Sequence, residues 1–565
     1  MDIDTGIDVH SDDNFNVRAK RIAITIILAF VLPALVLGVV YKKQFQRITD
    51  PTAMDMAQLA RNLGGGKGFT TYFIRPLQIT KSKDIARMPD MVNPPLYPSF
   101  LAVVMAKSPS DKKVAAASMF FFWLTILPLF ALTRRLFNVR VAQLTILAYV
   151  FSVMMIRMAV TGLPVTMAAF LFTTMCLAMY HLAQETAVDE DTPISTSKVA
   201  RFSAFSGALY ALCYLTDYNL LLALLPVLLF IWYVAGRVRK LAMTWFLIAL
   251  VVVAGPWWFR NLRVTGNPFF GLKASEIAMG TTKHPGLSLY RDTNGSSMLG
   301  YIQDDKSGIL KKLVVALDVA YQVVPVWGQQ WLAAFFVVGL FYSFKRPGAN
   351  AIRGMTFASL LLVTILSGVF TVQIGSLAVF APVLIAFAAA YFVRMLTDAN
   401  ANRVVTNAVS ALAVGIIILP FIIFAGTARS IPPRVGLEAE VAQVVGNNAI
   451  IVTDAALEMA WYGGKRAIWL PLTEKDFIAL DEIRPVQAIY LTRQVAPGVR
   501  SEHDYSTWSN VYWTFYTRGS RARFEAIEAG SLEGFQLYRD MPMEQKIAFL
   551  RSYAVLLMRP DAVKR

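Results

Sequence analysis

The chain has 565 residues, a mean hydropathy of +0.50 and a formal net charge of +17, and only 16% of its residues are charged. Several segments of about 17 to 24 residues are almost free of charge, enough for a helix to cross a hydrocarbon core of roughly 30 Å, so a soluble enzyme is excluded. The two cysteines, Cys176 and Cys213, lie in apolar segments and are too few for a disulfide framework or a Cys-type zinc site. Many Lys and Arg residues lie in short loops between apolar segments, which indicates membrane topology and not a nucleic-acid partner.

The apolar runs predict eleven membrane-spanning helices. The first run, 21–41, follows Arg18, Lys20 and Arg21 and is too long for a cleaved signal peptide, so we expect a permanent helix after a cytoplasmic tail of residues 1–20. The other expected spans are 113–134, 140–157, 163–183, 201–216, 219–235, 241–259, 327–344, 354–371, 375–394 and 404–426.

The distribution of charge in the loops predicts which pieces lie outside. Lys and Arg occur in the loops expected inside, whereas the short outer connections at 161–162, 217–218 and 372–375 contain none. We therefore expect the functional surface to face outward, where three longer pieces fall. They are a first outer loop at 42–112 and a second at 260–326, both within a membrane domain at 21–429, and a C-terminal domain at 430–565.

The C-terminal piece changes character after Ile431-Pro432-Pro433, where β-rich runs alternate with helical patterns. The β-rich runs are 449–452, 467–470, 487–491 and 553–558, and the helical patterns include 437–445 and 474–480. This alternation predicts a small α/β domain, and no GxGxxG or P-loop pattern points to a nucleotide. The predicted fold class is an α-helical polytopic membrane protein with a C-terminal extracytoplasmic α/β domain.

The first outer loop predicts two short helices at the membrane surface. One begins with Asp50 as its N-cap and Pro51 as its first residue, and ends at the glycines of 64–66. The other follows Pro94-Pro95, and its apolar run to Ala106 is too short to span, so we expect an interfacial or re-entrant helix.

Several stretches, taken in order, resemble a known family. They are Ala60-Arg61-Asn62-Leu63 with its Gly-rich exit, Pro94-Pro95-Leu96-Tyr97-Pro98, Pro256-Trp257-Trp258-Phe259-Arg260-Asn261 with Gly266-Asn267-Pro268, and Ala460-Trp461-Tyr462-Gly463-Gly464-Lys465-Arg466. The order resembles that of the GT-C glycosyltransferases, specifically the bacterial group similar to protein O-mannosyltransferases and lipid A aminoarabinose transferases. The resemblance covers nearly the whole chain.

The resemblance implies an inverting transfer of a sugar from a polyprenyl-phosphate carrier to a lipid, glycan or protein acceptor, at the outer face of a bacterial plasma membrane. It also implies an acidic residue of the first outer loop near the reaction centre. Family members commonly have Asp-Glu and a Tyr a few residues on, but here Pro51 and Met56 hold these positions. The choice between Asp50 and Asp55 therefore stays open, and Asp50 is preferred because the start of the helix is closest to the membrane plane.

The chemistry of such a transfer selects further candidates. A carboxylate is needed to take the proton of the acceptor, and cations are needed to stabilise the leaving phosphate. Candidate phosphate ligands are Arg260, Arg263, Arg75 and Lys67, although the first two could simply snorkel at a span end. Candidates for acceptor binding or other contacts are Asp90, Asn93, Tyr97, Asp217, Asn261, Glu276 and His284.

No cofactor or metal is indicated, since the four histidines show no HxxxH-type spacing; a divalent cation has no support in the sequence. The alternative function is a secondary transporter or flippase for a lipid-linked or envelope glycan precursor. It is less favoured because no internal repeat is evident and the ionisable residues gather at the outer face instead of within the spans. A non-catalytic scaffold for envelope polysaccharide synthesis would share the same topology.

Overall fold

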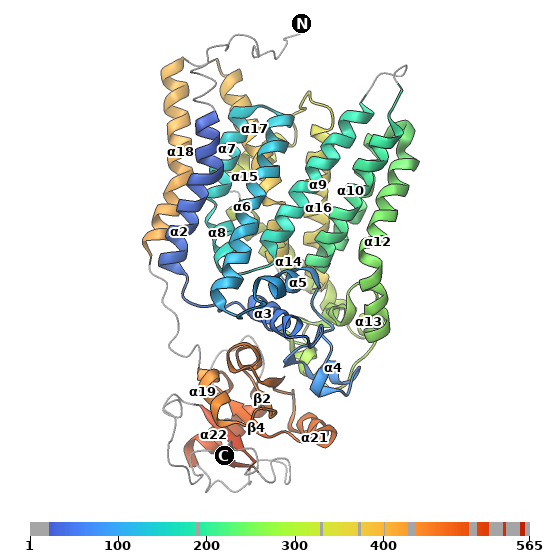
Figure 1. Cartoon of the computed structure of the whole chain (residues 1–565), viewed down its shortest axis with the longest axis vertical. Coiled ribbons are helices and arrows are strands. Elements are labelled where there is room, and N and C mark those ends of the chain that lie inside the picture. The colour runs from blue at the N-terminus through green and yellow to red at the C-terminus, as the bar shows by residue number, and fades with distance from the viewer. Residues whose placement is uncertain are drawn as a thin grey trace.

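The structure is a computed structural model in which a bundle of long helices and a small α/β domain are joined by a layer of short helices (Figure 1). The residues that it describes are 22–187, 193–327, 331–370, 374–400, 402–427, 437–496, 505–518, 535–537 and 554–559. The helical bundle and the α/β domain at its end agree with the predicted fold class.

The bundle is formed by helices that run roughly along the long axis of the molecule (Figure 1). They are η1 (Ile27–Val31), α2 (Leu32–Gln44), α6 (Asp111–Leu136), α7 (Val139–Val150), α8 (Val153–Val160), α9 (Val165–Thr186), α10 (Thr196–Thr216), η3 (Tyr218–Ala223), α11 (Leu224–Val234), η4 (Gly236–Val238), α12 (Arg239–Thr265), α14 (Lys306–Trp327), α15 (Trp331–Gly339), α16 (Ala349–Phe370), η7 (Ile374–Phe380), α17 (Ala381–Asp398) and α18 (Arg403–Gly426).

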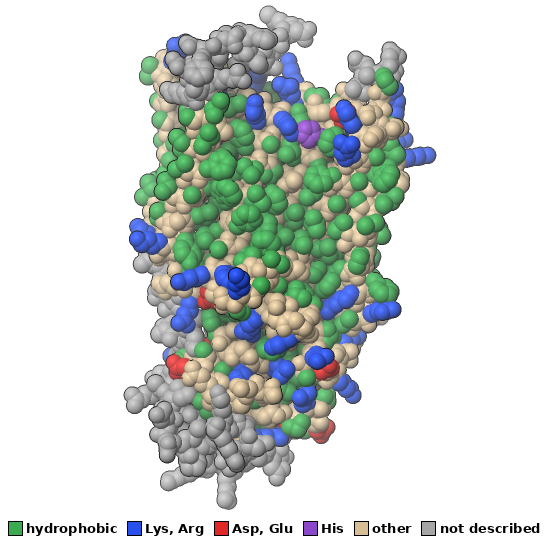
Figure 2. All heavy atoms as spheres, viewed as in Figure 1, with side chains coloured by type: hydrophobic (Ala, Val, Ile, Leu, Met, Phe, Trp, Pro, Cys, Tyr) green, Lys and Arg blue, Asp and Glu red, His purple; other side chains and the backbone are tan. Residues whose placement is uncertain are grey.

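Seven helices among the described residues are long and apolar enough to cross a membrane, and the pair α7 and α8, bent by 55°, would make an eighth. Figure 2 shows the matching surface, on which a broad hydrophobic band is bounded towards both ends by Lys and Arg side chains. Side chains of this band are exposed because lipid, and not protein, is their solvent. The chain is therefore a multi-pass membrane protein, but length and composition do not reproduce the count of eleven.

The expected span at 327–344 differs most from the structure. Helix α15 covers only Trp331–Gly339, whereas α14, at Lys306–Trp327, lies in residues that the sequence assigned to the second outer loop. The guanidinium of Arg353 donates hydrogen bonds to the backbone oxygens of Gly339 and Tyr342. These bonds satisfy the carbonyl group of Gly339, which the end of α15 leaves free, and that of Tyr342 just beyond the helix.

The layer below the bundle comes from the two outer loops. Its elements are α3 (Pro51–Gly64), β1 (Phe73–Ile74), α4 (Pro76–Ile79), η2 (Ile85–Arg87), α5 (Leu96–Val104), η5 (Gly271–Ala278), η6 (Ser288–Arg291) and α13 (Met298–Asp304). The two expected surface helices are present as α3 and α5, and α5 has nine residues, too few to span.

The two outer loops are packed tightly together at Gly271. Its φ of +55° is a left-handed conformation, and a Cβ atom there would lie 2.5 Å from the backbone oxygen of Met91. The next residue, Leu272, donates its N–H to that same oxygen at 2.8 Å. A glycine is thus required where the loops meet.

The C-terminal domain is a sheet with helices around it. Its elements are α19 (Leu437–Val444), β2 (Ile450–Thr453), α20 (Ala456–Glu458), η8 (Met459–Gly463), β3 (Arg466–Trp469), α21 (Glu474–Ile483), β4 (Ala488–Leu491), η9 (Arg493–Val495), α22 (Ser506–Arg518), β5 (Gln536–Leu537) and β6 (Val555–Met558). The strand order is β1-β3-β2-β4-β6-β5. All four expected β-rich runs are strands, and the first four strands of the sheet are parallel.

The edge strand of this sheet belongs to the first outer loop. Phe73 and Ile74 of β1 pair in parallel with Ala467 and Ile468 of β3. A second joint is formed by the stretch that carried the family resemblance in the C-terminal domain. Trp461 and Tyr462 both donate hydrogen bonds to the carboxylate of Asp111, at 2.7 and 3.1 Å. Two separate contacts therefore fix the C-terminal domain against the layer of short helices and the adjoining end of the bundle.

Candidate functional site

A cavity of about 540 Å³ lies where the outer loops, the span ends and the C-terminal domain meet. Its polar and charged lining residues are Thr52, Asp55, Arg75, Asn93, Thr216, Asp217, Lys273, Glu276, Tyr290, Asp454, Glu458 and Gln494. They come from every part that surrounds the cavity, so the site exists only when the C-terminal domain is docked.

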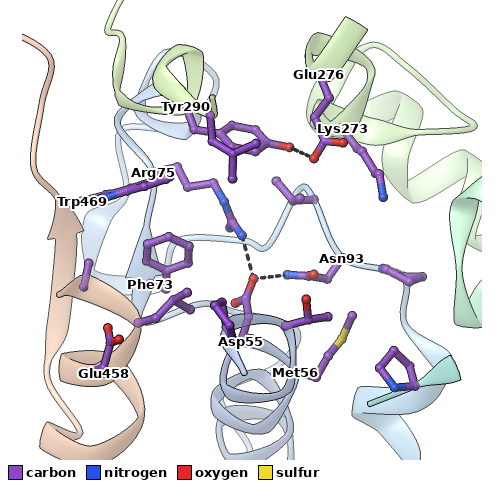
Figure 3. Close-up of a pocket in the computed structure, with 18 of the residues that line it drawn as sticks. Asp55, Met56, Phe73, Arg75, Asn93, Lys273, Glu276, Tyr290, Glu458 and Trp469 are labelled. Atoms are coloured by element: carbon purple, nitrogen blue, oxygen red, sulfur yellow. Dashed lines mark hydrogen bonds and ion pairs between the residues drawn. The ribbon is translucent and has the colours of Figure 1, made fainter. Parts of the chain in front are cut away.

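Asp55 lies at the centre of the cavity wall formed by the first outer loop (Figure 3). Its Oδ2 atom accepts hydrogen bonds from Arg75 Nη2 at 2.6 Å and from Asn93 Nδ2 at 2.8 Å. Its Oδ1 atom accepts from Gln58 Nε2 at 3.0 Å. Asp50 is the N-cap of α3, and Asp55, five residues further along, lies on the buried face of this helix. The result is a buried carboxylate held in one orientation by three donors.

A second carboxylate, Asp90, lies behind this group. Its Oδ1 atom accepts from the backbone N–H groups of Val92 and Asn93 at 3.1 and 2.7 Å, and its Oδ2 atom lies 3.8 Å from Arg75 Nη1. Burial, and then the charge of Asp55, raise the pKa of Asp90 despite the nearby Arg75. Burial lowers the pKa of Arg75, but the two carboxylates prevail and raise it, so the guanidinium stays charged.

The second outer loop contributes a buried carboxylate, Glu276, and a buried lysine, Lys273, to the cavity. Glu276 Oε1 accepts a hydrogen bond from the hydroxyl of Tyr290 at 2.7 Å, whereas its Oε2 atom, buried within the described structure, has no hydrogen-bond partner. Burial, and then the charge of Glu276, raise the pKa of Tyr290, which keeps its hydroxyl a donor. Lys273 is 8% exposed, lines the cavity and has no ion-pair or hydrogen-bond partner among the residues that are described (Figure 3).

The C-terminal domain contributes two acids to the opposite wall. Asp454 accepts from the backbone N–H of Thr492 at 2.8 Å and from its hydroxyl, and burial raises its pKa to about 6. Glu458 ends helix α20. Burial raises its pKa to about 7, although a hydrogen bond from its own backbone N–H acts in the opposite direction, and the charges of Glu438 and Asp454 add smaller increases. Trp469 lies nearby on the same wall (Figure 3).

Several predicted site residues do not line the cavity. Asp50 accepts from the backbone N–H groups of Thr52 and Ala53, as an N-cap does. Lys67 donates to the hydroxyl of Tyr72 at 2.6 Å on the surface. The predicted residues outside the cavity are Asp50, Lys67, Asp90, Tyr97, Arg260, Asn261, Arg263 and His284.

Arg260, the predicted principal phosphate ligand, forms hydrogen bonds with other residues of the protein. Its guanidinium donates to the backbone oxygen of Asp90 and, at 3.0 Å, to Oδ1 of Asn261. Its Cζ atom also lies 4.7 Å from the centre of the Trp257 ring. These contacts tie the first outer loop to α12 and thereby position Asp90. Arg263, by contrast, is exposed and lies over Phe259.

The remaining predicted residues have structural contacts. The buried hydroxyl of Tyr97 donates to the backbone oxygen of Gly162 at 2.9 Å. The ring of His284 is 6.1 Å from that of Tyr301, away from the cavity. Asp217 does line the cavity and accepts the hydroxyl of Ser376. In total the cavity brings together Asp55, Arg75, Asn93, Asp217 and Glu276 from the sequence candidates.

Sequence reasoning missed Lys273, Tyr290, Asp454 and Glu458. The sequence offers only one signal for them, which is that they lie within about fifteen residues of Glu276 or of the stretch 460–466. Within the described ranges, no group of three or more His, Cys, Asp or Glu side chains is placed to hold a metal ion. The lysine and the carboxylates that line the cavity are groups that can bind the anionic and hydroxyl groups of an organic ligand.

No protein-family model and no curated protein sequence matches the chain. Comparison with solved structures nevertheless identifies the fold as that of the GT-C membrane glycosyltransferases, in agreement with the resemblance seen in the sequence. The oligosaccharyltransferase AglB from Archaeoglobus fulgidus, in complex with an inhibitory peptide and a dolichol-phosphate, has a TM-score of 0.57 and 11% identity over 85% of this chain and 70% of that one.

A second similar structure is ArnT from Cupriavidus metallidurans bound to undecaprenyl phosphate. Its TM-score is 0.52 with 13% identity, over 84% of this chain and 93% of that one. The apo form of the Archaeoglobus oligosaccharyltransferase has a TM-score of 0.55 and 12% identity, over 85% and 71%. At these identities the likeness establishes a shared fold.

Proposed function

We propose that this protein is a GT-C glycosyltransferase that transfers a sugar, with inversion, from a polyprenyl-phosphate carrier to an acceptor. The carrier is a lipid phosphate, and the acceptor is a lipid, glycan or protein that presents a hydroxyl or amine. The observation that carries this proposal is the cavity at the end of the spans, where Asp55 is held by Arg75 and Asn93. Two structures with the same fold are described with dolichol-phosphate or undecaprenyl phosphate.

We propose an orientation with the N-terminus in the cytoplasm and the C-terminal domain outside, in a bacterial plasma membrane. The positive charges of the inner loops support this orientation. Helix α10, helix α11 with η3, and α14 with α15 would bring the eight candidate spans to the expected eleven. An impermeant thiol reagent should label a cysteine introduced at exposed Glu482 in intact cells, and protection of that site would reverse the orientation.

The phosphate of the donor would be bound by Lys273. A lysine amine that is largely buried without a carboxylate partner is costly, so an anion from outside the protein would stabilise it. Arg75 is also at the cavity, but its charge is already shared between Asp55 and Asp90. Phosphate leaves as an anion and needs no acid, only a cation that stabilises its developing charge.

The transferred sugar would lie against Asp55. A fixed carboxylate stabilises the positive charge that develops at the anomeric carbon, and a free lone pair of Oδ1 can accept a sugar hydroxyl. Of the two acids that the sequence offered, Asp55 lines the cavity and Asp50 caps α3. This placement favours Asp55 for direct contact with substrate.

Binding of undecaprenyl phosphate to the purified protein tests the phosphate site. Lys273→Ala should weaken binding at least tenfold, because it removes the cavity cation that has no carboxylate partner among the described residues. Lys81→Ala removes an exposed lysine from the first outer loop and serves as the matched control. Equal binding by both variants would remove Lys273 from the site.

Release of sugar from undecaprenyl-phosphate sugars, and the dependence of this release on Asp55, tests the transfer. Movement of the lipid across the membrane without cleavage would favour a flippase.

A further inference from the structure

Glu458 is placed differently from the other acids of the cavity. It lies at the end of α20, which packs against α3 and β1, the two elements that carry Asp55 and lead to Arg75. It therefore lines the cavity from the C-terminal domain, on the side where Phe73 and Asp55 of the first outer loop lie (Figure 3). The joint between Trp461 and Asp111, three residues further along, fixes this position.

The only donor to the carboxylate of Glu458 among the described residues is its own backbone N–H. Among the described residues it forms no ion pair and accepts no hydrogen bond from another residue. Asp55 accepts from three donors, and Asp454 accepts from Thr492 twice. An ionised carboxylate inside a cavity is stabilised by additional donors, and no other described residue supplies one to Glu458. A hydroxyl or amine of a bound ligand could take that place.

We infer that Glu458 is the general base of the proposed transfer and that the acceptor binds along the C-terminal wall of the cavity. This inference rests on the proposed function. The Glu458 carboxylate takes the proton of the acceptor hydroxyl while the acceptor oxygen bonds to the anomeric carbon. The bond from that carbon to the phosphate oxygen breaks, and polyprenyl phosphate leaves with the electron pair.

The hydrogen bonds of Asp55 and Glu458 indicate which of the two carboxylates can take up a proton. Proton uptake by Asp55 would disrupt its contacts with Arg75, Asn93 and Gln58, whereas proton uptake by Glu458 breaks no contact with another described residue. The pKa of about 7 that burial gives Glu458 is also near the optimum for a general base at neutral pH. Trp469 and Gln494 line the same wall, so an acceptor with a carbohydrate-like surface would meet an aromatic ring and an amide there.

The experiment uses the purified full-length protein with undecaprenyl-phosphate sugars, first with water as acceptor and then with azide. Glu458→Gln should lower turnover with water by on the order of a hundredfold, while binding of undecaprenyl phosphate stays as in the wild type. The matched control is Glu482→Gln, the same change at an exposed position of the C-terminal domain. Glu458→Ala should recover turnover when azide is added, because azide is an anion that attacks without losing a proton.

The outcomes separate the inference from the function on which it rests. Wild-type turnover in Glu458→Gln would overturn the role of Glu458 and leave the proposed transfer standing. Lost turnover that azide does not restore in Glu458→Ala would also overturn it, since a structural defect is not repaired by a nucleophile. Absence of sugar release by the wild-type protein would instead remove the proposed transfer itself.

Discussion

Arg75 and Asp55 form an ion pair in which Nη2 lies 2.6 Å from Oδ2, and each side chain is only 6% exposed. The two residues come from different elements of the first outer loop, with β1 between them and paired to the C-terminal sheet. The pair therefore couples the docking of the C-terminal domain to the position of the carboxylate in the cavity.

Arg75→Ala should destabilise the protein strongly. It leaves Asp55 and Asp90 buried without their cation, and removal of one partner from a buried pair costs about 3 to 5 kcal/mol. Arg75→Lys should recover only part of the stability, because a point charge cannot contact both carboxylates as the guanidinium does. Thermal unfolding in detergent measures both variants. A melting temperature unchanged in Arg75→Ala would mean that the ion pair contributes nothing to the fold.

Asp55→Asn and Asp50→Asn should have very different effects. Asparagine is as good an N-cap as aspartate, so turnover of Asp50→Asn should stay within about twofold of the wild type. Asp55→Asn removes the fixed charge that faces the sugar and should lower turnover by roughly a hundredfold or more. Sugar release from the lipid donor is the measurement. The opposite ranking would return Asp50 to the reaction centre, as the sequence preferred.

The overall architecture was predictable from the sequence because its signals are local. Uncharged runs of span length identify bundle helices, and β-rich runs identified the strands of the C-terminal sheet, such as β2 and β4. The edge strand β1 was not predictable, since two residues carry no pattern and their partner lies almost four hundred residues away. The start of α14 was missed because its lysines made it look like a loop.

The site was predictable only in part, for a related reason. Asp55, Arg75 and Asn93 lie in one loop, so a search confined to that loop could find them. Lys273 and Glu458 reach the same cavity only through the packing of the second outer loop and of the C-terminal domain. The sequence favours Arg260 as a phosphate ligand for its place after a span, but its guanidinium donates to the backbone oxygen of Asp90 and to Asn261, and it does not line the cavity.

Asp111→Ala should loosen the C-terminal domain without unfolding the bundle. It removes the acceptor shared by Trp461 and Tyr462, so the buried indole N–H of Trp461 loses its partner, whereas the hydroxyl of Tyr462 keeps the backbone oxygen of Ile48. Loss of such hydrogen bonds costs about 1 to 3 kcal/mol each. Cleavage by added protease within 428–436, before the described part of the domain, should become faster than in the wild type, and turnover should fall. Asp84→Asn, an exposed acid of the same loop, is the control. Equal cleavage rates would show that the other contacts, such as β1 and the hydrogen bond from Arg61 Nη1 to the backbone oxygen of Trp461, are enough to hold the domain.

Glu458 should make the stability of the protein depend on pH. Its pKa is about 7 in the folded protein against an ordinary value of 4.5, so the folded state holds the proton more tightly than the unfolded state. Between pH 4.5 and 7 the unfolded state therefore binds fewer protons, and Glu458 lowers stability as the pH rises.

Below pH 4.5 this destabilisation is absent, and above pH 7 it is complete. Glu458→Gln cannot ionise, so its melting temperature should exceed that of the wild type by about 2 °C or more at pH 8 and by much less at pH 5. The other charged groups on the neighbouring elements remain in both proteins: Asp55 and Arg61 on α3, Arg75 after β1, Glu438 on α19, Asp454 after β2 and Arg466 on β3. Taking the difference between variant and wild type cancels their titration to first order. A difference that is the same at both pH values would show that Glu458 is ionised alike in the folded and unfolded states, and the argument for a tuned base would then rest on its position alone.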